Sequence, residues 1–240
     1  MSTESILASL APSGTLRATI NVGNPILAAV EKTTGAPRGV SVDIARELAQ
    51  RLGAPLECVV VAAAAKSVET VASGRADVGF FAVDPVRGAD IAFTEPYVTI
   101  EGCFLVRRDS PIRDYSQVDA PDTRVAAGAG SAYDLFLTRE LQRATIIRVP
   151  TSPAVVDAFV EQGLEVAAGV KQQLEADAAR HGGLRLIEEP FMVIRQAMGI
   201  AKARGDLAAQ YLRAFIADLK ASGFVREALA RHGIKGATPG

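Results

Sequence analysis

Several residue types are scarce in this chain, and each shortage argues against a class of function. It has no tryptophan and only two histidines among 240 residues, and aromatic residues make up 5%. With so few aromatic side chains, stacking platforms for bases or sugars are few. The histidines, His181 and His232, form no metal-ligand spacing with the two cysteines, so we expect no metal and no cofactor.

Charge bias and long apolar runs are missing as well. The 26 basic and 27 acidic residues give a net charge of −1 and form no block, which argues against nucleic acid or an anionic membrane as partner. No apolar stretch of about 18 residues is present, so no transmembrane helix is expected. The first residues, 1–4, lack the basic start and apolar core of a secretory signal. Two alternatives stay open: a periplasmic protein whose signal was removed, or a cytoplasmic protein.

The two cysteines, Cys58 and Cys103, each lie in an apolar, strand-like run. Free cysteines are usually buried, which predicts two buried thiols. A disulfide between them remains the alternative.

Strand-like and helix-like segments alternate along the chain, which predicts βαβ units and a mostly parallel sheet. Within the helix expected at 42–52, Ser41 is the predicted N-cap, Gly53 the stop signal, and Asp43 a favourable charge for the helix dipole. The expected strands are 16–22, 56–61, 78–81, 102–107, 124–127, 145–149, 166–169, 184–187 and 197–201; the expected helices are 5–10, 42–52, 66–73, 132–142, 153–162, 171–180, 206–221 and 224–231.

We interpret this order as two α/β lobes. The expected first lobe is 1–104 plus 199–240, and the second is 105–198, with strands near 102–107 and 196–201 crossing between them as hinges. A cleft between such lobes is a common place for a small-ligand site. We expect a monomer.

Arg87 is the first candidate site residue, because it follows the strand at 78–81. Ligands in open α/β sheets bind beyond strand ends, and a guanidinium matches a carboxylate. The alternative is a solvated turn arginine paired with Asp84 or Asp90. Phe81 is the aromatic residue of this segment expected to line the ligand site.

A second candidate is the glycine-rich turn at 128–131, which follows a strand and opens a helix. The first N–H groups of a helix are unsatisfied and attract anions, and Ser131 can cap the helix and also donate to a ligand. Tyr133 is a possible wall of the site. The alternative is an ordinary capped loop.

Residues 14–233 resemble the extracellular solute-binding proteins that serve polar amino-acid ABC transporters. The central match is G-R-A-D-V at 74–78, followed by D-P-V-R at 84–87 and P-Y at 96–97. The other matching pieces are 14–17, 39–45, 105–110, 130–132 and 219–224.

The resemblance implies two Rossmann-like lobes of the type II periplasmic binding protein kind that close on a ligand. It also implies that Arg87, Ser131 and Ala132 hold a carboxylate.

Three positions depart from the family's pattern. Val170 stands where an aspartate commonly holds the ligand's ammonium, and Lys171 follows it. A buried ammonium without an anion is costly, so the departure favours an organic acid or a modified amino acid. Asp84 replaces a hydroxyl residue and either binds a cation or caps the turn. Asn24 lies where an aromatic residue often covers the ligand.

Three functions are therefore weighed. The leading one is a non-enzymatic binding protein that delivers a small carboxylate-bearing solute to an ABC transporter permease. The second is an enzyme on the same scaffold, resembling cyclohexadienyl dehydratase, with Asp84, Lys171 or Tyr133 as acid or base. The third is a cytoplasmic metabolite-sensing module.

Overall fold

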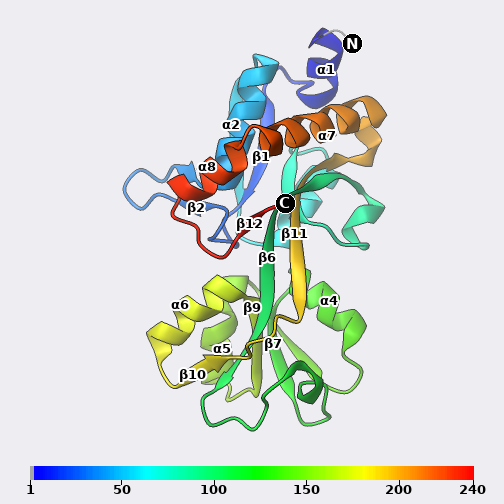
Figure 1. Ribbon diagram of the computed structural model, residues 1–240. Coiled ribbons are helices and arrows are strands. Elements are labelled where there is room, and N and C mark those ends of the chain that lie inside the picture. Colours follow the sequence, from blue (N-terminus) through cyan, green and yellow to red (C-terminus); the bar gives the residue numbers. More distant parts are fainter. Residues whose placement is uncertain (1–2) are drawn as a thin grey trace. The chain divides into compact units, whose positions relative to one another are not determined.

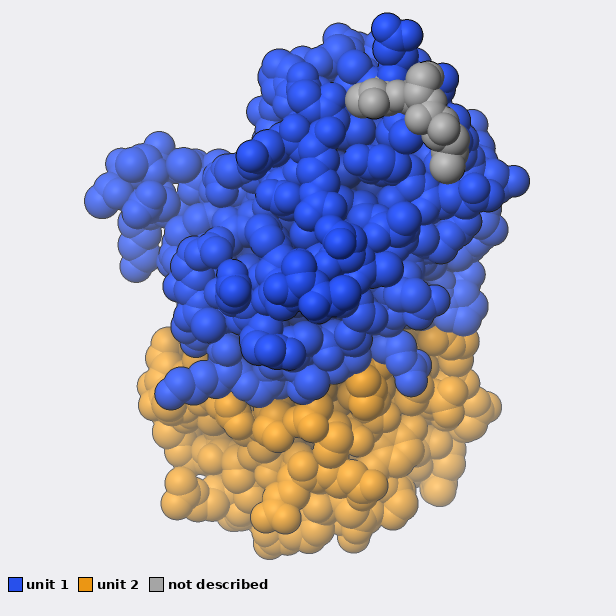
Figure 2. Space-filling view, turned by 45° about the horizontal axis from the view of Figure 1, so that its top comes forward, with its two compact units in different colours: residues 1–99, 195–240 blue, residues 100–194 orange. Residues whose placement is uncertain are grey.

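The computed structural model describes residues 3–240 and divides the chain into two compact units. Unit 1 comprises residues 1–99 and 195–240, and unit 2 comprises residues 100–194 (Figure 2). Both are mixed α/β structures, which confirms the fold class expected from the alternating pattern. The observed boundaries fall a few residues before the expected ones, 104 and 198. No helix in the described part of the chain is long and apolar enough to cross a membrane.

Unit 1 is built on a parallel strand pair with helices beside it (Figure 1). Its elements are α1 (Thr3–Leu10), β1 (Leu16–Asn21), β2 (Ala29–Val30), β3 (Pro37–Arg38), α2 (Val40–Leu52), β4 (Leu56–Val61), α3 (Ala64–Ala72), β5 (Gly79–Ala82), η1 (Arg87–Ala89), η4 (Lys202–Arg204), α7 (Asp206–Ala221), α8 (Phe224–Arg231) and β12 (Thr238–Pro239). β1 pairs with β4 in parallel, and Ala18 of β1 forms a parallel bridge to Val78, just before β5.

Unit 2 contains a sheet in the order β6-β9-β7-β8 with helices around it (Figure 1). Its elements are η2 (Tyr115–Gln117), β7 (Arg124–Gly128), α4 (Ala132–Glu140), β8 (Thr145–Val149), η3 (Ser152–Ala154), α5 (Val155–Glu161), β9 (Val166–Val170), α6 (Lys171–His181) and β10 (Leu184–Leu186). β7 pairs in parallel with both β8 and β9, as the alternation predicts. Its core gathers Leu105, Val155 and Phe159, among others.

Two strands carry the chain from one unit to the other. β6 (Ile91–Arg107) begins in unit 1 and ends in unit 2, and β11 (Met192–Ala201) runs back. β6 is much longer than the strand expected at 102–107. Its first half contains Pro96 and polar residues that hide the strand pattern, although Tyr97 and Val98 in it are fully buried.

The start of α2 differs from the expectation. The helix begins at Val40 after Gly39, whose φ of 124° suits only glycine, and no side chain caps it. Ser41 is therefore a buried residue of the first turn rather than the N-cap. Gly53 ends the helix in the left-handed conformation, as predicted.

Asp43 of α2 is held by side chains from distant sequence. Its carboxylate accepts hydrogen bonds from Arg231 at 2.7 Å, His232 at 2.9 Å and Arg46 at 3.3 Å. Besides its expected interaction with the helix dipole, Asp43 therefore links α2 to the end of α8.

Both cysteines are free thiols, so the alternative of a disulfide between them is wrong. Cys103 is fully buried in the core of unit 2. Cys58 is only partly buried, so the expectation of two buried thiols is wrong for it. The reason is that β4 pairs only with β1, which leaves one of its edges open.

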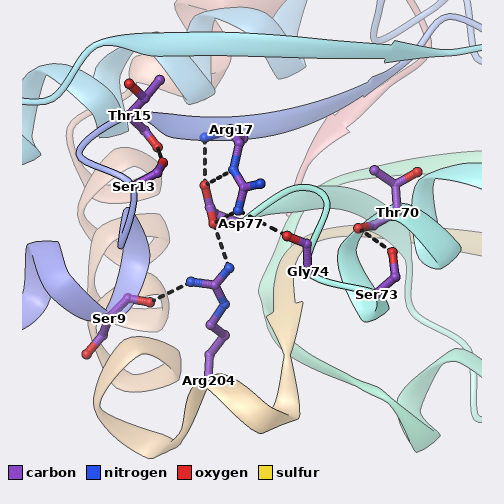
Figure 3. A network of polar contacts seen from close by, with 9 residues as sticks. All are labelled: Ser9, Ser13, Thr15, Arg17, Thr70, Ser73, Gly74, Asp77 and Arg204. Carbon is purple, nitrogen blue, oxygen red and sulfur yellow. Dashed lines mark hydrogen bonds and ion pairs between the residues drawn. The ribbon is translucent and has the colours of Figure 1, made fainter.

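A buried carboxylate fastens the start of β1 in unit 1 (Figure 3). Asp77 Oδ1 accepts hydrogen bonds from Arg17 Nη2 at 2.7 Å and Arg204 Nη2 at 2.6 Å. Its Oδ2 accepts from the Arg17 backbone N–H at 2.9 Å and from Arg17 Nε at 3.1 Å. Arg17 also donates to the carbonyl of Gly74, and Arg204 to that of Ser9. One side chain thereby joins β1, α1, η4 and the turn before β5.

Candidate functional site

Arg87 lies in η1, the turn that follows β5 in unit 1. Its guanidinium folds back onto the strand, because Nη1 donates to the carbonyl oxygen of Ala82 at 2.9 Å. Ala82 is the last residue of β5, so the charge sits at the carboxyl end of that strand. The residue is 5% exposed, which is incompatible with a solvated surface arginine.

Burial dominates the electrostatics of Arg87. Desolvation lowers the pKa of its guanidinium to about 10, and the negative charge of Asp84 acts in the opposite direction. The group therefore stays protonated at neutral pH. A buried cation of this kind is stabilised by an anion and by hydrogen-bond acceptors in a planar arrangement.

Asp84 is buried beside this turn. Its Oδ1 accepts the backbone N–H of Val86 at 2.8 Å, and its carbonyl oxygen accepts the N–H of Gly88 at 2.9 Å. Of the two expected roles, capping the turn is thus seen directly. Binding a ligand cation stays a prediction.

Asn24 lies in the turn after β1. Its backbone N–H donates to Asn21, and its carbonyl oxygen accepts from Leu27 and Ala28. Its side-chain Oδ1 is buried and has no hydrogen-bond partner among residues 3–240. Buried polar atoms are nearly always paired, so this oxygen is an exception to the rule.

β1 and β5 bring these turns to one edge of unit 1. Ala18 of β1 pairs with Val78 in parallel, so the carboxyl ends of β1 and β5 lie at the same edge of unit 1. Asn24 follows β1 and Asp84 follows β5. Since ligands bind beyond the carboxyl ends of parallel strands, the three side chains Asn24, Asp84 and Arg87 occupy the expected edge.

Phe81 does not belong to this set. Its ring packs in the core of unit 1 with Val71 and Ile91 and makes an edge contact with Phe93. Room for it comes from Gly79 on the same strand face, where an added Cβ would lie 2.4 Å from the ring. The expectation that Phe81 lines the ligand site is therefore wrong. Its neighbour Phe80 packs edge-on against Tyr97.

In unit 2 the loop from β7 to α4 forms the second candidate set. Ser131 is the N-cap of α4, and its Oγ accepts the N–H of Asp134 at 3.1 Å, which confirms the predicted cap. Gly130, with a φ of 67°, donates its N–H to Asp134 Oδ2 at 2.8 Å. Asp134 in turn pairs with Arg148. Ala132 is the first residue of the helix, so its N–H points out of the helix start.

Tyr133 is 2% exposed and follows this cap. Burial raises the pKa of its phenol. Its hydroxyl oxygen forms no hydrogen bond within the described part of the chain. The phenol is thus neutral at physiological pH, and its role as a wall stays a prediction.

Val170 and Lys171 lie at the same edge of unit 2, because β9 runs parallel to β7. Val170 ends β9 and is the N-cap residue of α6, with no side-chain cap. Lys171 Nζ donates to Glu101 Oε2 at 2.7 Å, and Glu101 raises the pKa of the ammonium. Lys171 is thus half-exposed and paired with a carboxylate.

Three residues near the candidate site residues were not predicted from the sequence to belong to the site: Glu101, Asp134 and Ser152. Glu101 directly precedes Gly102, which pairs with Val170 across the antiparallel β6–β9 ladder, so a register prediction would have found it. Ser152 packs against Gly128, where an added Cβ would lie 2.9 Å from its Oγ.

A separate hollow of about 460 Å³ opens on unit 2. Arg108, His181 and Leu184 are among its lining residues, and it includes none of the expected site residues.

Comparison with known proteins agrees with this architecture. The sequence profile of the bacterial extracellular solute-binding proteins, family 3, matches residues 16–234. Among solved structures, the L-cysteine solute receptor of Neisseria gonorrhoeae is 24% identical with a TM-score of 0.81, covering 94% of this chain and 92% of its own. The cysteine-binding protein of Campylobacter jejuni is 20% identical with a TM-score of 0.81, covering 98% and 99%.

A third solved structure is an ancestral amino acid-binding protein described as a precursor of cyclohexadienyl dehydratase. It is 20% identical with a TM-score of 0.78, covering 95% of this chain and 99% of its own. At these identities the likeness shows the fold, which is that of the type II periplasmic binding proteins. A comparison with curated proteins gave no significant match.

Proposed function

Because the chain belongs to the bacterial extracellular solute-binding proteins of family 3, we propose that it binds a small carboxylate-bearing solute and delivers it to an ABC transporter. The solute is an amino acid, a close derivative or an organic acid. The partner for delivery is the transporter's permease, and the place of action is the periplasm.

The burial of Arg87 at the end of β5 carries this proposal. A guanidinium that is 5% exposed and still protonated at neutral pH, at the carboxyl end of a strand, is a strong binding group for a ligand carboxylate. The hydrogen bond from Nη1 to the carbonyl oxygen of Ala82 holds the guanidinium at this strand end. A ligand carboxylate at this strand end receives paired, charge-assisted hydrogen bonds from it.

The open N–H groups at the start of α4 in unit 2 support the same ligand class. Ser131 uses its side chain to cap Asp134, which leaves the N–H of Ala132 directed toward solvent or ligand. The names of the similar structures support the same ligand class, since two are cysteine-binding proteins and the third is an ancestral amino acid-binding protein.

The test is a thermal-shift screen of amino acids and organic acids, followed by calorimetry on Arg87 variants. Arg87→Ala is expected to weaken a found ligand by about 100-fold, because a buried charge pair is lost. Arg87→Lys keeps the charge without the fork and is expected to recover only part of the affinity. Arg213→Ala removes an exposed arginine of unit 1 as the control.

Unchanged affinity in a folded Arg87→Ala protein would overturn the assignment. Circular dichroism and the melting temperature of each variant establish that the protein is folded.

Catalysis on this scaffold receives less support. A general acid or base works best with a pKa near the operating pH. Burial raises the pKa of Tyr133, and pairing with Glu101 raises that of Lys171, so both move away from neutrality. Asp84 accepts the N–H of Val86 as a turn cap. Incubation with prephenate or arogenate, with detection of aromatic product, separates an enzyme from a binding protein.

A further inference from the structure

We propose that the hollow on unit 2 is a second binding site, and that it takes a small organic anion, an oxyanion carried on a short apolar group. The site shares no residue with the candidate set around Arg87 or with the loop before α4. It therefore stands or falls independently of the proposed function.

The hollow lies where the end of β6, the end of α6 and the start of β10 meet (Figure 1). The antiparallel ladder places Gly102 of β6 opposite Val170, at the edge of the sheet that carries the candidate residues of unit 2. Since each strand residue advances the chain by about 3.3 Å, Arg107 lies about 16 Å beyond Gly102. The hollow is thus at the opposite edge of the sheet.

Arg107 is a partly buried cation whose guanidinium is held in place without being neutralised. Its Nη1 donates to the carbonyl oxygen of Leu164 at 2.6 Å, and its Cζ lies 4.7 Å from the centre of the Phe159 ring. A carbonyl oxygen and a ring face attract a cation, but neither carries a full negative charge. No carboxylate of residues 3–240 forms an ion pair with Arg107, so most donors of an oriented fork stay open.

Paired arginines elsewhere in unit 2 show that this is not a general feature of the unit. Arg124 pairs with Glu165 at 2.8 Å, and Arg180 pairs with Asp157 at 2.7 Å. Arg108, a second cation in the lining of the hollow, has no such partner in the described part of the chain. Two adjacent arginines without a carboxylate give this edge an excess of positive charge, which attracts anions.

Arg185 of β10 adds to this excess. Its Nη2 donates to the carbonyl oxygens of Ser110 at 3.0 Å and Ile112 at 2.6 Å. Burial lowers the pKa of its guanidinium, and the positive charge of Arg113 lowers that pKa further. Asp109 is the one acidic residue among the described residues that line the hollow, so the lining keeps a net positive charge.

The remaining lining favours an anion with an apolar part. Val160 is 37% exposed and lines the hollow together with Leu184, so an alkyl group bound there covers apolar surface. The ring of His181 is held by a carboxylate of α5 at 2.7 Å, and Gly182 and Gly183 offer bare backbone. The volume of about 460 Å³ is within the range of small-molecule sites.

The experiment is a titration of isotope-labelled protein, followed by the chemical shifts of backbone amides at low ionic strength. The probes are butyl phosphate, pentanoate, inorganic phosphate and the neutral 1-butanol. Butyl phosphate and pentanoate are expected to shift the amides of Gly182 and Gly183 with a dissociation constant of about 1 mM, because each partly hydrated arginine contributes modestly. Inorganic phosphate should bind about 10-fold more weakly, and 1-butanol should cause no shift.

Charge variants test the cations. Arg108→Ala is expected to weaken butyl phosphate about 3-fold, and Asp109→Asn to strengthen it by a similar factor. Arg107→Met keeps an unbranched chain over Phe159 but removes the fork, and should weaken binding about 10-fold. Arg143→Ala, which removes another exposed arginine of unit 2, is the control and should leave the affinity unchanged.

Val160→Thr tests the apolar part, because it keeps the shape of the side chain and adds a hydroxyl. It should weaken butyl phosphate about 3-fold and leave inorganic phosphate unchanged. Inorganic phosphate binding as tightly as butyl phosphate would overturn the assignment of an organic anion.

Absence of shifts at Gly182 and Gly183 with both organic anions would overturn the site itself. So would equal affinities of the wild type, Arg108→Ala and Asp109→Asn, two variants of exposed residues that do not depend on the folding of Arg107→Met. Arg87→Ala should leave these shifts unchanged. If it abolishes them, the anion acts through the site of unit 1, so this inference fails while the proposed function stands.

Discussion

Replacing Asp77 by asparagine tests how unit 1 is held together. The side chain keeps its shape but loses its charge. Two arginines then lose their shared anion, Arg17 at 2.7 Å and Arg204 at 2.6 Å. The new amide also turns an N–H₂ group toward one of the donors it replaces. The amide oxygen still accepts hydrogen bonds on its own side, and the hydrogen bonds from Arg17 to Gly74 and from Arg204 to Ser9 are unaffected.

The magnitude follows from the burial of the three groups. Breaking a buried ion pair from one side costs about 3 to 5 kcal/mol, because the remaining charge is left without compensation. Asp77 is fully buried, but Arg17 and Arg204 are 25% and 18% exposed and recover part of their hydration. We therefore expect a loss of about 3 kcal/mol in the free energy of unfolding. In a chain of this size, that lowers the melting temperature by roughly 6 to 12 °C.

Calorimetry at pH 7 measures the shift, and hydrogen exchange across β1 locates it in unit 1. Glu69→Gln is the matched control, because Glu69 also bridges two cations, Lys66 and Arg75, yet is 51% exposed. Exposed pairs contribute little, so the control should melt with the wild type. Equal melting temperatures for Asp77→Asn and Glu69→Gln would refute the reasoning that burial makes this carboxylate important.

Two further predictions concern pH and thiol chemistry. Hydrogen bonds from Arg124 lower the pKa of Glu165, so this carboxylate adds stability above its ordinary pKa of 4.5, and that stability is lost as the pH falls through the lowered folded value. The melting temperature of Glu165→Gln should accordingly lie below that of the wild type at pH 7, and the two should converge near about pH 3. A difference in melting temperature that persists in acid would contradict the link between the lowered pKa of Glu165 and stability. Burial raises the pKa of Cys103 to about 11. A thiol reagent at pH 8 should therefore modify only the partly exposed Cys58 in the folded protein, and Cys58→Ser should abolish that reaction. Labelling of Cys103 before unfolding would contradict its burial.

Local patterns in the sequence were sufficient to predict the alternating architecture and the family. The stop signal Gly53 after α2 and the cap Ser131 before α4 act through neighbours within four residues, and both behave as predicted. Arg87 could be placed at a strand end for the same reason, since β5 and its turn are contiguous.

Contacts between distant segments were beyond reach of such patterns. Lys171 pairs with Glu101 across seventy residues, and Asp43 meets the end of α8 across nearly the whole chain. Alternation along β5 shows that Phe80 and Phe81 face opposite ways, but both rings are buried, and the contacts of Phe81 depend on Gly79 and the residues around it. The unpartnered oxygen of Asn24 is likewise a property of the assembled turn.

The path of the chain has a consequence for biosynthesis. Residues 100–194 are contiguous, so all of unit 2 is synthesised before residues 195–240, which belong to unit 1. Unit 1 is completed later, when residues 195–240 have been synthesised. Only then can β5 pair with its antiparallel partner β11, with Met198 opposite Phe80, and α2 contact the end of α8. The portion synthesised first is therefore the portion completed last, and its apolar strand β5 is the surface that a nascent chain must keep from aggregating.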